Sequence, residues 1–346
     1  MSFITNIRSV AKYESKILVR SWFFRIFTLL AVVFLGFFNF AMMLMEDNFG
    51  LWFAKSVSSN IPYLNLLLLN TGQAVVAVFL SSEFLKRDKK LDTSEVFYVR
   101  PLSNAEYVVG KIWGNLRVFL FLNLLVLAIV LAFNFMASGV TVDLPAYLIY
   151  FFLISIPTLI FIIGLSIFLM LLLKNQALTF ILLLGYIGLT LFYIQDKFYY
   201  LFDYMVYNLP LFKSTIVGFS NLELILNHRA IYFFAGLGFI FFTIFLFKRL
   251  PNARRSHYPW LFLSFCMFLL MVTAGFRHVR SILWEGEMRA LYTSINNKYV
   301  YEPKMAIDYY DISVEQKSET IRSVVGMEGT ALAASEVFIF CLNPGL

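Results

Sequence analysis

Charged residues are scarce in this chain. Asp, Glu, Lys and Arg make up 14% of its 346 residues, whereas about 25% is usual for a soluble domain. Hydrophobic residues make up 60% and aromatic residues 18%. A soluble protein of this size would need far more charge to stay in solution, so the excess apolar surface must face something other than water. A lipid bilayer is the simplest candidate, and we predict an all-α polytopic membrane protein.

Residues that usually carry catalysis are also few. The only histidines are His228, His257 and His278, which fall in different loops or at the ends of apolar runs. The sequence contains neither a His-Glu-x-x-His zinc motif nor a Gly-x-Ser-x-Gly elbow. The nearest match to a phosphate loop, residues 105–112, has Ile112 where a Ser or Thr should hold magnesium. We therefore expect no catalytic, cofactor-binding or metal site, and no enzyme activity in this chain by itself.

The net charge of +7 could in principle suit a nucleic acid. However, the basic residues occur in short clusters between apolar runs and form no continuous basic face, so we expect no nucleic-acid partner. Basic clusters between apolar runs are typical of the cytoplasmic side of a membrane protein.

Seven apolar runs approach or exceed the roughly 20 residues that a helix needs to cross a bilayer. They are Phe23–Met45, Ile61–Leu80, Leu116–Met136, Tyr147–Leu173, Ala177–Ile194, Ala230–Phe247 and Pro259–Phe276. Only residues 174–176 separate the fourth run from the fifth, which predicts a tight helical hairpin. The first run is too long for the apolar core of a signal peptide and is expected to be retained.

Loops rich and poor in Lys and Arg alternate along the chain. The N-terminal segment, the loop after the second run and the loop after the sixth run are rich in basic residues. The loops at 54–60 and 137–146 contain one and none, respectively. This alternation predicts a cytoplasmic N-terminus and, with seven spans, an extracytoplasmic C-terminal tail.

Two segments outside the apolar runs have recognisable patterns. Residues 1–22 are predicted to form an amphipathic helix on the cytoplasmic membrane surface, with a solvated helix as the alternative. In residues 277–346 charge returns, and Asp311–Val314 and Val337–Phe340 look strand-like. The tail is therefore predicted to be a partial β-rich extracytoplasmic domain. Its end at Asn343-Pro344-Gly345, a turn signal directly after a strand, suggests a fragment of a longer protein.

The second basic loop, residues 83–112, is too ordered for a simple connector. Thr93 or Ser94 can cap a short helix, Pro101 would end that helix, and Ser103 or Asn104 can cap the next one. These features predict a short helix parallel to the membrane that presents acidic and basic groups to a soluble partner.

The order of residues in this loop resembles the coupling-helix loop of type 2 ABC transporter permeases. A charged run is followed by Thr93-x-Glu95, then by Arg100-Pro-Leu-Ser103, and then by Tyr107-x-x-Gly110-Lys111. The resemblance covers about residues 3–250. By position, it implies that the residues meeting an ATPase are Glu83, Thr93, Glu95, Arg100, Pro101, Ser103, Gly110 and Lys111.

The resemblance implies a six-helix ABC exporter-type domain at residues 23–250 in a bacterial cytoplasmic (inner) membrane. Such a permease subunit would form a homodimer or pair with a second permease, and would bind a separate ATP-binding subunit. The seventh span, at 251–276, and the tail depart from a minimal six-span permease. Similar modules occur fused to outward-facing zinc aminopeptidase-like domains in Bacteroidetes-type proteins, so a membrane anchor for a peptidase-like domain beyond the chain end is the alternative. A secondary transporter is disfavoured because the two halves show no inverted repeat.

A few polar residues interrupt the apolar runs. A translocation path could be lined by Asn65, Asn70, Thr71 and Gln73, although such residues also act as hydrogen-bonding links between helices. Arg117, near the start of the third run, is predicted to be the one charge that enters a span, and it is expected either to reach back to the cytoplasmic surface or to serve in gating. The sequence Gly110-x-x-x-Gly114 suggests close helix packing at the start of this run. None of these features identifies a transported substrate.

Overall fold

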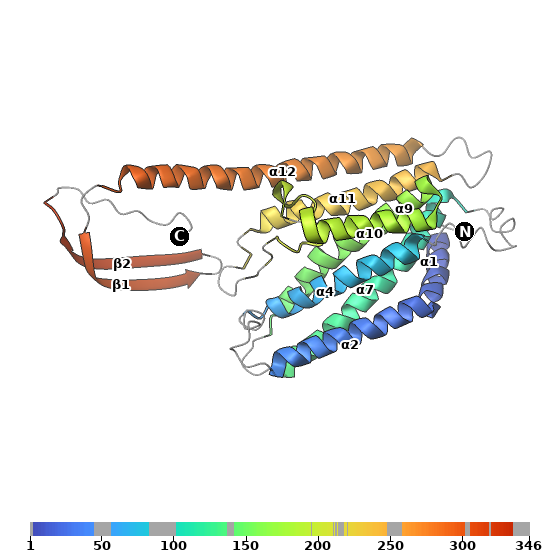
Figure 1. Cartoon of the computed structure of the whole chain (residues 1–346), viewed down its shortest axis with the longest axis horizontal. Coiled ribbons are helices and arrows are strands. Elements are labelled where there is room, and N and C mark those ends of the chain that lie inside the picture. The colour runs from blue at the N-terminus through green and yellow to red at the C-terminus, as the bar shows by residue number, and fades with distance from the viewer. Residues whose placement is uncertain are drawn as a thin grey trace.

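The computed structural model describes residues 3–44, 57–82, 102–136, 142–194, 196–209, 211, 213, 218–219, 221–247, 258–301, 305–317 and 320–334. This part of the chain is a helical bundle with one small β-hairpin (Figure 1). It contains seven segments long and apolar enough to span a membrane, as predicted. They are α2 (Trp22–Leu44), α4 (Asn60–Ser82), α7 (Asn104–Met136), α8–η1–α9 (Leu144–Tyr150, Phe151–Ser155, Ile156–Leu173), α10–η2 (Gln176–Leu189, Thr190–Ile194), α11 (Leu222–Leu246) and α12 (Tyr258–Lys298). The chain is thus a multi-pass membrane protein.

The predicted hairpin between the fourth and fifth spans is confirmed. α9 ends where Lys174 takes a left-handed backbone conformation, with φ of 53°. The side chain of Asn175 then accepts a hydrogen bond of 3.2 Å from Leu178 N and caps α10. Two adjacent caps allow the chain to reverse with almost no loop.

α1 (Phe3–Arg20) lies across one end of the bundle, at a steep angle to the spans (Figure 1). Its buried face consists of Ala11, Glu14, Ser15 and Leu18, and this face packs against α7. The predicted N-terminal helix therefore exists, and it is held by protein contacts along one side rather than being solvated all round.

The centre of the bundle is formed by α4, α7, α9 and α11. The largest fully buried side chains come mainly from these helices and from the irregular segment before α11; among them are Leu66, Phe119, Ile162 and Tyr204. By contrast, α2, α10 and α12 bury only a small share of their surface. In a bilayer, these three helices are left to face lipid or another protein.

α12 continues well past Phe276, where the seventh span was predicted to end, and itself ends at Lys298. The residues from Arg277 to Lys298 include no proline, and Glu285 pairs with Arg289 one turn later at 3.8 Å. Helix-compatible residues therefore extend α12 although the apolar run has ended.

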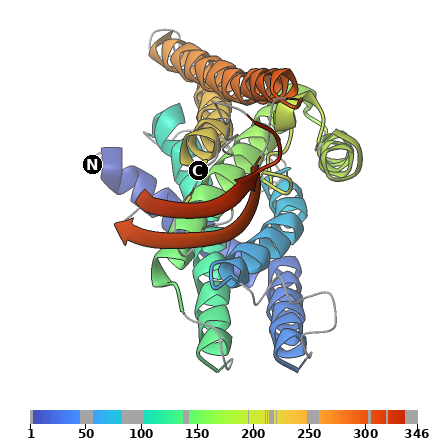
Figure 2. The same cartoon turned by 90° about the vertical axis from the view of Figure 1, so that its left-hand side faces the viewer.

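The chain then forms an antiparallel hairpin of β1 (Met305–Lys317) and β2 (Thr320–Ala331) at the end of the molecule opposite α1. Figure 2 shows this hairpin in front of the bundle when viewed from that end. The predicted strand Asp311–Val314 lies within β1, whereas Val337–Phe340 lies outside the described residues. Tyr310, Ile312 and Val325 share one face of the hairpin and are all exposed.

Candidate functional site

The predicted coupling residues divide into two groups. Glu83, Thr93, Glu95, Arg100 and Pro101 lie outside the described residues. Ser103, Gly110 and Lys111 lie in the first part of α7, where α1 crosses the bundle. The described residues therefore include the junction between this loop and the third span.

Ser103 and Asn104 were the two residues predicted to cap this helix, and Ser103 caps α7 through a capping box. Its Oγ accepts a hydrogen bond of 3.1 Å from Glu106 N, and its own N–H donates to Glu106 Oε2 at 2.6 Å. Glu106 Oε1 also accepts from Asn6 of α1 at 2.9 Å. The side chain of Asn104 donates to Phe247 O at the end of α11. The first turn of α7 is thus tied to α1 and to α11.

Gly110 and Gly114 allow α1 to lie directly on α7. A Cβ placed on Gly110 would lie 2.7 Å from Val10 Cβ, and one placed on Gly114 would lie 2.7 Å from Glu14 Cβ and 2.8 Å from Ala11 O. Real Cβ atoms do not approach other atoms so closely. The Gly110-x-x-x-Gly114 pattern therefore packs α7 against α1, rather than against a second span.

Charged groups close the same junction. Lys111 Nζ lies 3.7 Å from Glu14 Oε2, and both side chains are buried. Arg117 donates to Ala11 O at 2.7 Å and to Ser15 Oγ, and Ser15 Oγ in turn donates to Gly114 O at 2.6 Å. Arg117 was predicted either to reach the cytoplasmic surface or to serve in gating, and neither prediction included this contact with α1. Together these contacts make α1 and the start of α7 one rigid unit.

Four polar side chains form a closed ring in the middle of the bundle. Gln73 donates to Asn70 Oδ1 at 2.6 Å, and Asn123 donates to Gln73 Oε1 at 2.9 Å. Ser155 donates to Asn123 Oδ1 at 2.8 Å and lies 3.2 Å from Asn70 Nδ2. All four residues are fully buried. The ring joins α4, α7 and η1, and it includes two of the four predicted path residues.

The other two predicted path residues have different surroundings. Asn65 forms a reciprocal amide pair with Asn39 of α2, with distances of 2.7 and 3.1 Å. Thr71 is half-buried and donates to Leu67 O within its own helix at 2.9 Å. The predicted path residues omitted Asn39, Asn123 and Ser155, although each is a polar residue inside an apolar run and could have been recognised by that signal.

Arg229 is the buried charge that the sequence analysis missed. The sixth span was predicted to begin at Ala230, but α11 begins at Leu222, so Arg229 lies inside a span and is 2% exposed. The prediction that Arg117 is the single charge within a span was therefore wrong. The earlier start follows from residues 222–229, because Leu222, Leu224, Ile225 and Leu226 continue the apolar pattern while Arg229 finds partners inside the protein.

The guanidinium of Arg229 is surrounded by acceptors. It donates to Leu153 O at 2.7 Å, Tyr204 O at 3.0 Å, Thr158 Oγ1 at 2.8 Å and Ile154 O at 3.4 Å. Leu153 lies in the π-helical segment η1, four residues before Pro157, which has no N–H to donate to the Leu153 carbonyl. Arg229 supplies the missing donor and thereby stabilises the irregular helix within the membrane.

An irregular segment with unusual backbone conformations packs beside Arg229. Phe198, Tyr199 and Tyr200 have positive φ values of 52°, 59° and 62°, which are unfavourable for residues with a side chain. Two histidine rings hold this turn. His278 Nε2 donates to Tyr199 O at 2.9 Å, and His228 Nε2 donates to Tyr200 O at 3.0 Å. His228 and His278 are therefore buried structural residues rather than interfacial ones, whereas His257 lies outside the described residues.

Asp203, in the same segment, is 1% exposed. Its carboxylate accepts hydrogen bonds from Tyr207 N at 2.9 Å and Asn208 N at 2.8 Å. Burial raises the pKa of Asp203, although these two backbone donors and the charge of Arg229 lower it in part. Within the described ranges, no group of three or more His, Cys, Asp or Glu residues is placed to hold a metal ion.

Comparisons with protein-family models and with curated proteins found no match for this chain.

Proposed function

We propose that this chain is the membrane-spanning permease subunit of an ATP-driven exporter, which couples to a separate ATPase through residues 83–112. The observation that supports this proposal most directly is the α1–α7 unit. The loop that resembles a coupling helix leads straight into a capped helix, and this helix is fastened to α1 by Gly110, Gly114, Lys111 and Arg117.

Such a unit suits the transmission of movement. A partner pressing on the loop would act on the first turn of α7, which Ser103 and Glu106 make rigid. α7 runs without interruption from Asn104 to Met136 and carries Asn123 of the polar ring. α1 leads directly into α2 with only Ser21 between them. A displacement at the loop would therefore reach α2 and the centre of the bundle as a rigid-body movement.

The proposed path would form between two copies of the chain. Asn65, Asn70 and Gln73 are fully buried within one chain, so lining a path requires α4 to separate from α2 or α7. The ring around Asn123 contains only neutral groups, and water or a polar part of the cargo could replace its hydrogen bonds. Thr71 is already half-buried and needs the smallest movement. The exposed faces of α2, α10 and α12 are available for pairing with a second copy.

A pull-down from native membranes in mild detergent tests the proposal. Wild type would be compared with a Glu95→Arg, Arg100→Glu double variant, which inverts charges in the loop. Lys174→Glu, an exposed charge inversion in the α9–α10 turn, is the matched control. We expect an ATPase to co-purify with wild type and with the control but not with the double variant. Absence of an ATPase from all three, with normal membrane insertion, would contradict the proposal.

A second candidate function is a membrane anchor for an outward-facing, peptidase-like domain. α12 is 41 residues long and carries the hairpin away from the bundle, which suits an anchor that displays a domain at a distance. The exposed apolar side chains on one face of the hairpin suit packing against further protein. This function predicts that membrane insertion and the stability of the outer region persist when no ATPase is bound.

A further inference from the structure

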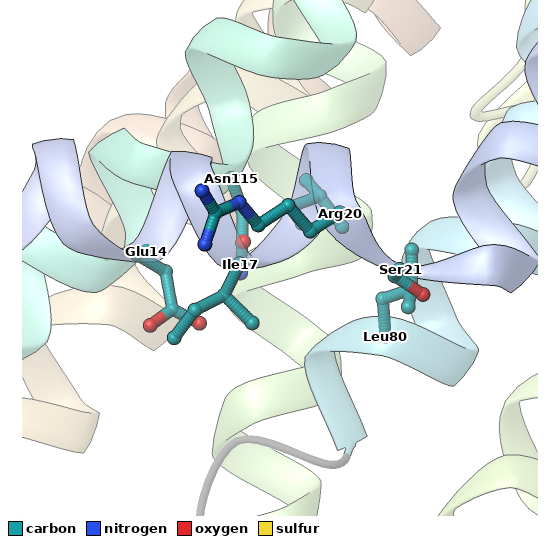
Figure 3. A pocket seen from close by; sticks show the side chains of 7 residues that line it. Glu14, Ile17, Arg20, Ser21, Leu80 and Asn115 are labelled. Atoms are coloured by element: carbon teal, nitrogen blue, oxygen red, sulfur yellow. The ribbon is translucent and has the colours of Figure 1, made fainter.

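A cleft lies at the corner where α1 meets α2, α4 and α7 (Figure 3). Its volume is about 290 Å³. The lining residues are Glu14, Ile17, Leu18, Arg20, Ser21, Leu80 and Asn115. The cleft is separate from the polar ring and from the Arg229 cluster, and none of the contacts that fasten α1 to α7 fills it.

Two side chains with N–H donors line this cleft, and they come from different helices. Asn115 is 3% exposed, yet its side-chain amide makes no hydrogen bond to any other described residue. Because Asn115 lines the cleft, its amide N–H groups can donate to an acceptor bound there. Arg20 also lines the cleft, and its side chain is exposed, so its guanidinium is accessible to a ligand. Ser21 adds a hydroxyl group at the break between α1 and α2.

The charge in and around the cleft favours an anion. Glu14 is the one carboxylate among the lining residues, and Lys111 lies 3.7 Å from it and offsets its charge. Among the residues that line the cleft, Arg20 therefore carries the positive charge that no lining carboxylate offsets. A planar guanidinium with an adjacent amide and hydroxyl is a set of donors well matched to phosphate oxygens.

The position of the cleft identifies the source of the phosphate. α2 enters the membrane at Trp22, directly after Ser21, and Trp22 is 76% exposed. Exposed Trp at the end of a span is typical of the membrane–water interface, where phospholipid head groups lie. Ile17, Leu18 and Leu80 form the apolar part of the cleft and suit the glycerol and first methylene groups of a lipid.

We infer that this cleft binds the phosphate head group of a membrane phospholipid, with Arg20, Ser21 and Asn115 donating to the phosphate oxygens. A lipid bound there occupies the corner between α1 and α2 and fills a gap beside the unit formed by α1 and α7. This site is independent of whether an ATPase couples to the loop.

Native mass spectrometry of the full chain tests the inference. The detergent-solubilised protein would be titrated with phosphatidylglycerol, and the variants Arg20→Gln and Asn115→Leu would be compared with wild type. Arg8→Gln is the control, because Arg8 is exposed on the same helix and does not line the cleft. Equal thermal unfolding temperatures establish that each variant is folded, and Arg20→Lys is a second, milder variant.

We expect Arg20→Gln and Asn115→Leu each to weaken binding of the first lipid at least about tenfold, while Arg8→Gln has no effect and Arg20→Lys retains most of the affinity. Equal weakening by Arg8→Gln would mean general attraction to a basic surface and would overturn the site. Unchanged binding in both cleft variants would also overturn it. Competition by inorganic phosphate at concentrations equal to those of the lipid would identify a soluble anion instead of a lipid.

Discussion

Replacement of Arg229 by Met would test how the irregular helix around η1 is held in the membrane. The change removes a guanidinium that makes four hydrogen bonds and leaves Leu153 O, Tyr204 O and Thr158 Oγ1 without this donor. Hydrogen bonds between transmembrane helices contribute about 0.6 kcal/mol on average, which gives about 2.4 kcal/mol for four. Removing one partner of a buried charged cluster costs about 3–5 kcal/mol in soluble proteins. We therefore expect a loss of about 2–5 kcal/mol in the free energy of unfolding.

The measurement is reversible unfolding of the purified full chain, by titration of SDS into mild detergent with helicity as the signal. Arg277→Met is the matched control. Arg277 is paired with Glu223 at 2.8 Å, but the two side chains are 64% and 72% exposed. Exposed ion pairs contribute about 0–1 kcal/mol, so this variant should stay close to wild type. Arg229→Lys keeps the charge but offers fewer donors in a different geometry, and should fall between wild type and Arg229→Met.

The reasoning fails if Arg229→Met unfolds within about 0.5 kcal/mol of the Arg277→Met control, since that margin is what surface substitutions produce. In that case the carbonyl of Leu153 would be satisfied in another way, and the π-helical segment would not depend on α11.

Three further outcomes follow from the structure. Gly114→Ala should lower the stability by about 1–3 kcal/mol because its Cβ would collide with Glu14, whereas Gly36→Ala, with nothing within 4 Å, should not; thermal unfolding compares them. Asn123→Leu opens the polar ring and should cost about 1–2 kcal/mol in the SDS titration, and an unchanged midpoint would count against the ring. Burial raises the pKa of Asp203, so the folded protein holds this proton more tightly than the unfolded chain does. The resulting stabilisation is fully present below the pKa of the unfolded chain, about 3.9, and is lost as the pH rises through the pKa of the folded protein. Asp203→Asn should remove that loss from the pH profile of unfolding, and a profile identical to that of wild type would contradict the assignment.

Several local features could be predicted because each depends on neighbouring residues. The α9–α10 hairpin follows from Lys174 and Asn175, which end one helix and cap the next within two positions. Ser103 and Glu106 form a capping box that can be recognised from their spacing alone. The first residues of helices without such signals were harder to predict. α11 begins eight positions before the predicted start at Ala230, because Glu223 and Arg229 interrupt the apolar run without interrupting the helix.

The role of each polar residue could not be predicted in the same way. Asn70 and Gln73 were recognised as polar residues in a span, but their partners Asn123 and Ser155 come from other helices. Gly110 and Gly114 were expected to pack closely, but the sequence does not show that the partner is α1. Leu153 and Arg229 lie far apart along the chain, and only the hydrogen bond between them in the folded bundle explains how a buried charge is tolerated.

The sequence by itself determined the number and approximate position of the spans, because crossing a bilayer requires about 20 consecutive apolar residues and this length is a property of the chain alone. It also determined the helix ends with local caps. The tertiary structure decided which polar and charged groups meet, since a hydrogen bond depends on the distance between atoms and not on their separation in sequence. In a membrane this difference matters most, because a buried donor or acceptor has no water to replace a missing partner, so Arg229 and the ring around Asn123 acquire their roles only in the folded bundle.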